Sequence, residues 1–336
     1  MAPGDPQVGA AGSSGEDKYK DAPDAKHLLD MIGKDVHEQV KNDEAKKYIE
    51  ELEGSLSLAK ISGGESAGFS EPCGLIKDKR DKLLGDRGER HPCGNGSASE
   101  KRYSKERVDE YDNKKMKCSN GKNEGACAPF RRLHLCNKNF QNMNSKDSSK
   151  AKNDLLLDVC MAAKYEGESL KGYHEQYEVQ YPGSGSDFPM CTMLARSFAD
   201  IGDIVRGKDL YLGKKKKKQN GKETERDQLE NKLKEIFENI KKENNSKLKS
   251  LTDDQIREYW WALNRRDVWK AITCDAPHDS KYFRQTCGGD NKKTTIRTPN
   301  QCRCTKTSDG KPDDQVPTYF DYVPQYLRWF EEWAED

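Results

Sequence analysis

The segment REYWWALNRRDVWKAITC (residues 257–274) decides the fold, because its apolar residues recur at helical spacing on more than one side. Thr252 and Asp253 precede it as an N-cap, so the pattern predicts a helix that begins there. A helix that is apolar on several sides is covered by other helices, and we expect this one at the centre of a bundle. The apolar core positions are Ile256, Tyr259, Trp260, Trp261, Leu263, Val268, Trp269 and Ile272.

Four more helices are predicted around this segment, over residues 154–182, 187–205 and 229–240 and from Pro324 onward. Glu166 interrupts the apolar stripe of the first one, and the chain stops inside the last one without a C-cap. Residues 154–336 are therefore interpreted as a helical bundle. The stripes consist of Leu156, Val159, Ala163, Leu170, Tyr173 and Tyr177; Met190, Leu194, Phe198, Ile201 and Val205; Leu229, Leu233, Ile236 and Ile240; and Leu327, Phe330 and Trp333.

The N-terminal part contains two shorter amphipathic patterns. Residues 1–23 are rich in Gly, Pro, Ala and Ser, and we expect them to be disordered. Asp24 is predicted to cap a helix. Residues 24–70 are too few to enclose a core, so their apolar stripes should pack on the main body. Residues 61–70 should form the linker to that body. The two stripes are Leu29, Ile32, Val36 and Val40, then Ala45, Tyr48, Ile49, Leu52 and Leu56.

Residues 71–153 show little periodicity and many turn residues, with a short helix predicted over 104–111. Cysteine-bearing loops of this kind need cross-links, so we expect disulfides formed in an oxidising compartment. No Cys-x-x-Cys pair occurs and the six histidines are scattered, which argues against zinc, and we expect no metal and no cofactor. The predicted disulfide cysteines are Cys73, Cys93, Cys118, Cys127, Cys136, Cys160, Cys191, Cys274, Cys287, Cys302 and Cys304, an odd number.

Composition excludes several classes of function. The chain of 336 residues is 33% hydrophobic and 35% charged, and no stretch is long and apolar enough to predict a membrane-spanning helix. The N-terminus lacks the apolar core of a cleaved signal peptide. Motifs of nucleotide-binding and hydrolytic enzymes are absent, so no catalytic residue is predicted and the protein is interpreted as a non-enzyme. A net charge of +1 without aromatic residues between the lysines disfavours nucleic acid as a partner.

Two local clusters of positive charge are the candidate binding residues. On a disulfide-fixed frame such residues can bind sulfate groups of glycans, whereas the alternative is a solvated charged loop, because Asp78, Asp81, Asp86 and Glu89 interleave with the first cluster. For the second cluster we expect a flexible, solvated loop that strengthens polyanion binding without specificity. The candidate glycan-binding residues are Lys77, Lys79, Arg80, Lys82, Arg87 and Arg90 in the first cluster, and Lys214, Lys215 and Lys216 in the second.

Other charged residues are interpreted as structural. Arg131, Arg132 and His134 are assigned a weaker binding role and a stronger role in folding. Asp200 and Asp203 lie three apart on one helical face, and we expect ion pairs with Arg196 and Arg206 and no paired-carboxylate catalysis.

Several long strings closely resemble one family, the alpha-class Duffy-binding-like domain that heads the erythrocyte membrane protein one (var) adhesins of the malaria parasite. The resemblance covers about residues 24–336 and is specific, because the strings occur in the family's order. They are EPCGLIKDKRDKLLG (71–85), GACAPFRRLHLCNKNF (125–140), CTMLARSFADIGDIVRGKDLYLG (191–213), REYWWALNRRDVWKAITC (257–274), TPNQCRC (298–304) and VPTYFDYVPQYLRWFEEWAED (316–336).

The resemblance implies a mainly α fold: an N-terminal segment over 24–70, a loop-rich, disulfide-linked subdomain 1 over 71–153, and a helical-bundle subdomain 2 over 154–336. Subdomain 3 would be largely missing, and its cysteines would supply a partner for the odd one. The family lacks a conventional signal peptide and carries its membrane anchor far downstream. From the bundle geometry we also expect Cys191 to pair with Cys274.

Two functions remain open. The first is host-cell adhesion by a variant surface antigen on the infected erythrocyte, through red-cell or endothelial surface receptors and sulfated glycosaminoglycans such as heparan sulfate. The second is an antigenically variable head that positions an adjacent receptor-binding cysteine-rich interdomain region. If the acidic N-terminal helices mask basic surface, deleting residues 1–60 should increase retention on heparin.

Overall fold

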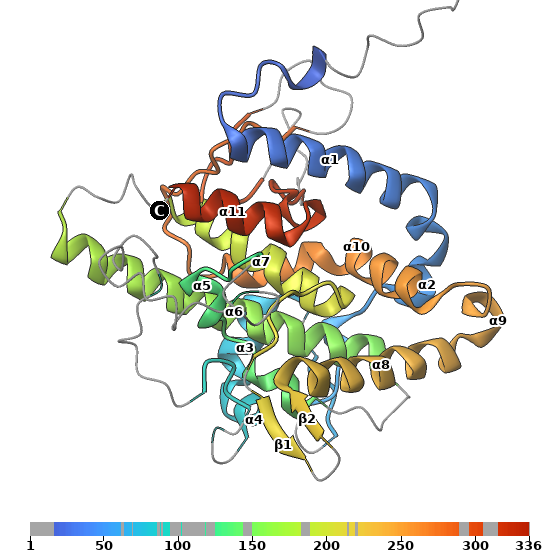
Figure 1. The fold of residues 1–336 in the computed structure, drawn as a ribbon. Coiled ribbons are helices and arrows are strands. Elements are labelled where there is room, and N and C mark those ends of the chain that lie inside the picture. The colour runs from blue at the N-terminus through green and yellow to red at the C-terminus, as the bar shows by residue number, and fades with distance from the viewer. Residues whose placement is uncertain are drawn as a thin grey trace, which may run out of the picture.

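The computed structural model is a helical body in which three long helices cross at the centre (Figure 1). They are α6 (Ala151–Gln180), α7 (Met190–Arg206) and α10 (Asp253–Ile272), and each is in contact with the other two. The residues described are 17–61, 64–68, 70–85, 88, 90–94, 102, 118, 125–143, 150–182, 189–213, 215–218, 221–288, 296–304 and 315–335.

The bundle confirms the helices expected from periodicity. Thr252 caps α10 in a capping box with Gln255, and Trp260 and Trp261 are fully buried. Around the centre lie α8 (Glu225–Glu243), α9 (Asn245–Leu248), the 3-10 helix η7 (Phe320–Tyr322) and α11 (Gln325–Glu335). In the part of the chain that the structure describes, no helix has the length and apolar character needed to cross a bilayer.

The stripe on α6 is interrupted by a buried residue. Glu166 is fully buried and accepts hydrogen bonds from the backbone N–H of Cys136 (3.0 Å), from Ser197 Oγ (2.6 Å) and from Arg102. A buried carboxylate is tolerated when it is paired and hydrogen-bonded in this way. Glu166 thus connects the loops around Arg102 and Cys136 to the bundle.

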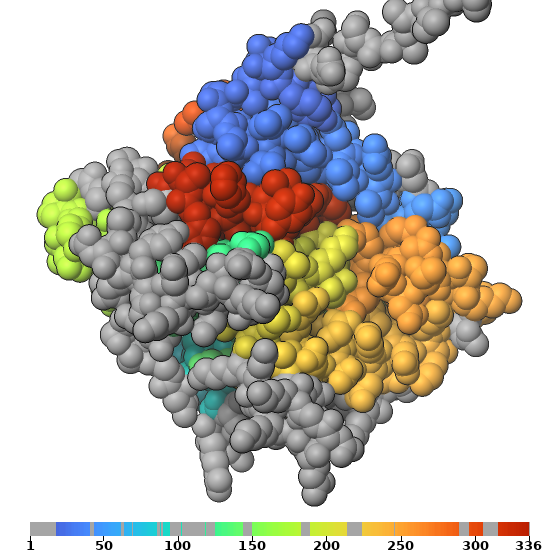
Figure 2. All heavy atoms as spheres, viewed as in Figure 1, coloured from blue at the N-terminus to red at the C-terminus, as the bar shows by residue number. Residues whose placement is uncertain are grey.

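The N-terminal segment lies across the bundle on the side of α11, and Figure 2 shows α1 (blue) directly against α11 (red). Its elements are η1 (Asp17–Tyr19), α1 (Ala25–Asp43), η2 (Ala45–Tyr48), α2 (Ile49–Leu52) and η3 (Leu56–Leu58). Asp24 caps α1 as predicted. The expected disorder of residues 1–23 is wrong for Asp17–Tyr19, because Lys18 and Tyr19 both bond to Asp35 of α1.

The predicted contact face of α1 is right only in part, because Leu29 and Val40 pack against the core but the middle of the stripe does not. Ile32 and Val36 are 37% and 38% exposed, whereas Asp30, Gly33 and His37 are buried. Asp30 is fully buried. It accepts hydrogen bonds from the backbone N–H of Tyr319 (2.6 Å), the hydroxyl of Tyr282 (3.2 Å) and the guanidinium of Arg284 (2.8 Å). Polar partners on the body therefore determine which side of α1 docks.

The described residues between the N-terminal segment and α6 form short elements: α3 (Pro72–Asp78), α4 (Arg80–Leu84), α5 (Phe130–Leu133) and η5 (Lys138–Asn142). The helix predicted over 104–111 lies outside the described residues. Five disulfides hold these loops and those after α10: Cys73–Cys274, Cys93–Cys136, Cys118–Cys127, Cys191–Cys302 and Cys287–Cys304.

Two cysteine predictions are wrong. Cys191 pairs with Cys302 and Cys274 pairs with Cys73, because α3 packs on α10 near its C-terminus whereas Cys191 begins α7 beside the 300–304 loop. Cys160 forms no disulfide: it lies in the middle of α6, fully buried among apolar side chains. The odd cysteine is therefore a core residue and has no need of a partner from another subdomain.

The lysine run between α7 and α8 also differs from expectation. Lys215 and Lys216 lie in strand β1 (Lys215–Lys218), which pairs antiparallel with β2 (Gly221–Thr224), so the expected flexible loop is wrong for them. Thr224 ends the hairpin and also caps α8, which anchors the ladder to the bundle. Lys214 lies outside the described residues.

A candidate polyanion-binding surface on α3 and α4

The first basic cluster lies on two short helices that are fixed to the bundle. Pro72 is the first residue of α3, Glu71 caps it by accepting the N–H of Cys73 (2.7 Å), and Leu75 and Ile76 are buried beneath it. The disulfide from Cys73 to Cys274 ties this helix to the end of α10. The charged side chains on α3 and α4 are thus carried by a rigid frame.

The outward side of this frame carries Lys77, Arg80 and Lys82, all of which are exposed. Lys82 Nζ lies 2.8 Å from a carboxylate oxygen of Glu65, and Lys79 also lowers the pKa of this glutamate. The Arg80 guanidinium lies 5.8 Å from the ring centre of Tyr165 on α6. We call Lys77, Lys79, Arg80 and Lys82 the α3–α4 basic surface.

Arg90 does not belong to this surface. Its guanidinium pairs with Asp158 of α6, a carboxylate that is 5% exposed. Burial raises the pKa of Asp158 to about 6, although the charge of Arg90 opposes the shift. Arg90 is therefore a structural partner of a buried acid, and we leave it out of the α3–α4 basic surface; Arg87 lies outside the described residues.

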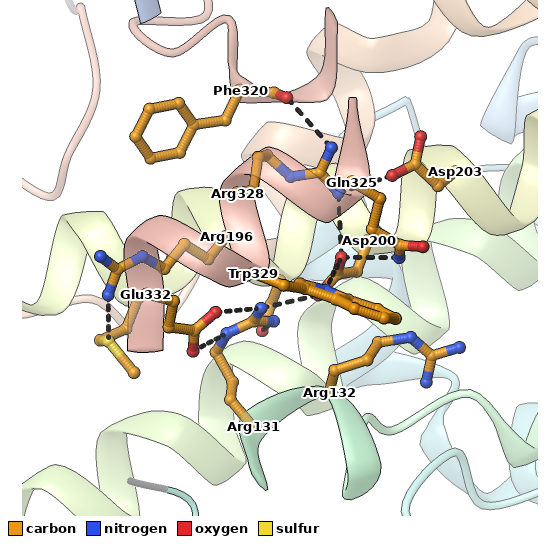
Figure 3. Close-up of polar contacts among 12 residues, drawn as sticks. Arg131, Arg132, Arg196, Asp200, Asp203, Phe320, Gln325, Arg328, Trp329 and Glu332 are labelled. Carbon is orange, nitrogen blue, oxygen red and sulfur yellow. Dashed lines mark hydrogen bonds and ion pairs between the residues drawn. The ribbon is translucent and has the colours of Figure 1, made fainter. Parts of the chain in front are cut away.

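A second group of arginines is buried between α5, α7 and α11 (Figure 3). Arg131 donates to Asp200 (2.6 Å) and to both oxygens of Glu332 (2.9 Å each), and Arg328 donates to Asp200 (2.9 Å) and Asp203 (2.5 Å). These arginines lower the pKa of Asp200 to about 2 against the opposing effect of burial. We call this group the buried ion network.

The buried ion network confirms the structural interpretation of its residues and corrects one partner. Arg206 pairs with Asp203 (3.0 Å) as predicted, but Arg196 reaches Glu331 (2.9 Å) and Glu335 (2.6 Å) of α11 instead of Asp200. Arg132 pairs with Asp209 (2.6 Å) and is buried. Side chains so enclosed cannot reach an external ligand.

Sequence reasoning missed three residues next to the α3–α4 basic surface: His91, Lys138 and Tyr165. The His91 ring meets the Tyr165 ring edge-on with centres 4.7 Å apart. Burial and the positive charges of Arg80 and Lys138 lower the pKa of His91. In the sequence, His91 and Lys138 each lie two residues from a cysteine, Cys93 and Cys136 respectively. That spacing indicates that the two side chains are close together only once these cysteines are known to form a disulfide.

The N-terminal helices do not mask this surface. In Figure 1, α1 lies at the upper end of the molecule and α3 and α4 lie toward the lower end. Among the described residues, the N-terminal part contacts this surface through the exposed pair of Glu65 with Lys82. Within the described ranges, no group of three or more His, Cys, Asp or Glu side chains is placed to hold a metal ion.

Comparisons with known proteins agree with this architecture. A model of the Duffy binding domain matches residues 125–328, and a model of N-terminal segments of PfEMP1 matches residues 24–60. No curated protein sequence matches the chain.

Similar solved structures extend beyond this chain. The NTS-DBL1-alpha and CIDR-gamma double domain of PfEMP1 from the Plasmodium falciparum varO strain is 30% identical with a TM-score of 0.66, over 92% of this chain and 43% of that one. The varO NTS-DBL1(alpha-1) domain is 30% identical with a TM-score of 0.60, over 92% and 60%. The PfEMP1 IT4var13 DBLbeta domain bound to ICAM-1 is 26% identical with a TM-score of 0.60, over 91% and 65%. The chain therefore spans less than two thirds of each of them.

Proposed function

Because this chain belongs to the Duffy binding domain family and carries an N-terminal segment of the PfEMP1 type, we propose that it is a host-cell adhesion domain that binds sulfated glycans such as heparan sulfate. It would act as the extracellular part of a variant antigen on the infected erythrocyte. The observation that carries the proposal is the α3–α4 basic surface, with Lys77, Arg80 and Lys82 exposed on helices tied to the bundle core.

The chemistry of this surface fits a repeating polyanion. Sulfates remain ionised at all physiological pH values, lysine meets them as a point charge, and arginine can donate two parallel hydrogen bonds. Lys82 is held by an exposed pair with Glu65, which is weak enough for a sulfate to replace. Single contacts of this kind are salt-sensitive, and many copies on one cell would make adhesion strong.

A protein receptor on red cells or endothelium is the second host partner that we propose. The IT4var13 DBLbeta relative is described in complex with ICAM-1, which supports a receptor-binding role for a domain of this fold. Glycan capture would then provide the first, electrostatically steered encounter.

The test is elution of the oxidised, folded chain from heparin in a salt gradient. The proposal predicts elution well above physiological salt for the wild type and a clear shift to lower salt for the triple variant Lys77→Gln, Arg80→Gln, Lys82→Gln. A matched control neutralises three lysines elsewhere, Lys34→Gln, Lys242→Gln and Lys249→Gln, and should shift elution less. Equal shifts for the two triple variants would show a diffuse charge effect and contradict a binding surface on α3 and α4.

The competing function is a scaffold that positions a neighbouring domain. The pairing of NTS-DBL1-alpha with CIDR-gamma in one varO structure favours it, because there the two domains occur in a single chain. Flow-through on heparin by this chain and by a version extended through subdomain 3 would support the scaffold and direct the receptor search to the following domain.

A further inference from the structure

The turn over residues 90–94 lies close to Arg80 of the α3–α4 basic surface, because the charge of Arg80 acts on His91 in this turn. Residues 90–94 form a turn that the Cys93–Cys136 disulfide holds against the start of η5, and the backbone N–H of Lys138 donates to Pro92 O (2.9 Å). The exposed Lys138 side chain lies across Gly94, where a Cβ atom would be only 2.7 Å from its Cδ and 2.8 Å from its Nζ. The turn that carries His91 therefore holds the backbone of Lys138, and the Lys138 side chain lies against this turn.

His91 is close enough to two cations, Arg80 and Lys138, for the charge of each to lower its pKa. Its ring is partly exposed and rests on Tyr165, and the backbone N–H of Cys93 donates to its Nδ1 (3.2 Å). That hydrogen bond requires the neutral ring, because a protonated Nδ1 cannot accept. Without a ligand, the local positive charge and this hydrogen bond both favour neutral His91.

We propose that one anion subsite extends from Arg80 across His91 to Lys138, and that a sulfate group bound there favours protonation of His91. This inference rests on the proposed glycan binding and adds to it a position, two residues and a pH dependence. A bound sulfate would offset the positive charges of Arg80 and Lys138, and a protonated imidazole would add one more cation to the subsite. By linkage, acidification then strengthens binding.

The other charged groups around His91 do not remove this effect. From α6, Glu168 favours the protonated ring, but its carboxylate lies 2.6 Å from Lys164 Nζ. Lys164 itself also reaches Asp275 (3.4 Å) and lies 5.2 Å from the ring centre of Tyr165. From the 90–94 turn, Arg90 is paired with Asp158. Within the described part of the chain, Arg80 and Lys138 are thus the cations near His91 that form no ion pair with a carboxylate.

The experiment measures the affinity of the full chain for a heparin-derived oligosaccharide at about pH 6 and about pH 7.5 at constant ionic strength. Lys138→Gln should weaken binding about fivefold, the size of one favourable exposed ion pair, and Lys138→Arg should restore it. Lys249→Gln, on the distant exposed segment after α9, is the charge-matched control and should bind like the wild type. The wild type should bind more tightly at the lower pH, because a ligand that favours the protonated ring binds best where that ring is protonated.

His91→Gln should give equal affinity at both pH values, and the His91 Cε1–H NMR titration should move to higher pH when the oligosaccharide is bound. The subsite is overturned if Lys138→Gln binds like Lys249→Gln, or if His91→Gln keeps the pH dependence of the wild type. Wild-type binding that is lost only in the Lys77, Arg80 and Lys82 variant would leave the proposed function standing and reject this subsite. Absence of any wild-type binding would reject both.

Discussion

The buried ion network and the α3–α4 basic surface are built from the same residue types but have opposite surroundings. Arg131 and Arg328 are 1% and 2% exposed and each contacts two carboxylates, whereas Lys77 and Arg80 are exposed to solvent. Enclosed charges must be paired, so their geometry is fixed and they hold helices together. Exposed charges keep their hydration and can exchange it for a ligand. Burial, not residue type, separates the structural charges from the candidate binding residues here.

The largest effect should come from breaking the buried ion network. Arg328→Ala leaves Asp200 and Asp203 without one of their cations inside the body, and we expect it to lower the free energy of unfolding by about 3–5 kcal/mol. Chemical denaturation measures this loss. Lys82→Ala breaks the exposed pair with Glu65 and should change stability by less than about 1 kcal/mol. A loss below 1 kcal/mol for Arg328→Ala would contradict the comparison.

A smaller effect should follow from overfilling the docked face of α1. A Cβ atom on Gly33 would lie 2.2 Å from the carbonyl oxygen of Tyr319, so Gly33→Ala should cost about 1–3 kcal/mol or release α1. Hydrogen exchange of the α1 amides measures the release. Ile32→Ser, one residue away on the exposed side, is the control and should leave exchange unchanged. Faster exchange in the serine variant alone would show that α1 docks by its apolar stripe.

Glu331, which pairs with Arg196, should make the stability of the folded chain depend on pH. Burial raises the pKa of Glu331 well above its ordinary value, to about 7, although Arg196 opposes this. The folded chain therefore binds this proton more tightly than the unfolded chain, so the stabilisation is present in acid and is lost as pH rises through about 7. Between pH 6 and 8 we expect a loss of about 1 kcal/mol in urea unfolding that is absent in Glu331→Gln. A parallel pH profile for the two proteins would argue against this assignment.

The smallest effect on stability is expected at the α3–α4 basic surface. The triple variant Lys77→Gln, Arg80→Gln, Lys82→Gln should keep the wild-type free energy of unfolding within about 0.5 kcal/mol per site, since none of these side chains is buried. Thermal and urea unfolding both measure it. A large loss would mean that the surface is structural and that reduced heparin binding by the variant reflects misfolding.

Periodicity predicted much of the bundle. The capped helix α10 and the stripes of α6, α7, α8 and α11 lie where the sequence placed them, because apolar burial dominates there. The face of α1 was predicted only in part, since its buried residues Asp30 and His37 are polar and find partners far along the chain. Disulfide pairing was also out of reach: Cys73 and Cys274 are 201 residues apart, and spacing alone allows many pairings.

The candidate site was predicted in part. The sequence identified the cluster that contains Lys77, Arg80 and Lys82 but could not show that Arg90 of the same cluster faces the buried Asp158. Nor could it show that Lys138 joins the cluster, because that proximity depends on the Cys93–Cys136 bond. The order of acidic and basic residues along the sequence does not show which of these side chains the fold will bury.

The account assigns Arg90 to structure and Lys77, Arg80 and Lys82 to binding, although all four lie in one stretch of sequence. The most direct test measures the free energy of unfolding and the affinity for a heparin oligosaccharide in a variant of each group. Arg90→Gln leaves Asp158 without its cation, and we expect a loss of about 1–3 kcal/mol in unfolding free energy with heparin-oligosaccharide affinity of the folded protein unchanged. The Lys77, Arg80 and Lys82 triple variant should show the reverse, wild-type stability within about 0.5 kcal/mol per site and at least about tenfold weaker binding. Affinity that falls in Arg90→Gln at unchanged stability, or binding that persists in the triple variant, would contradict the account.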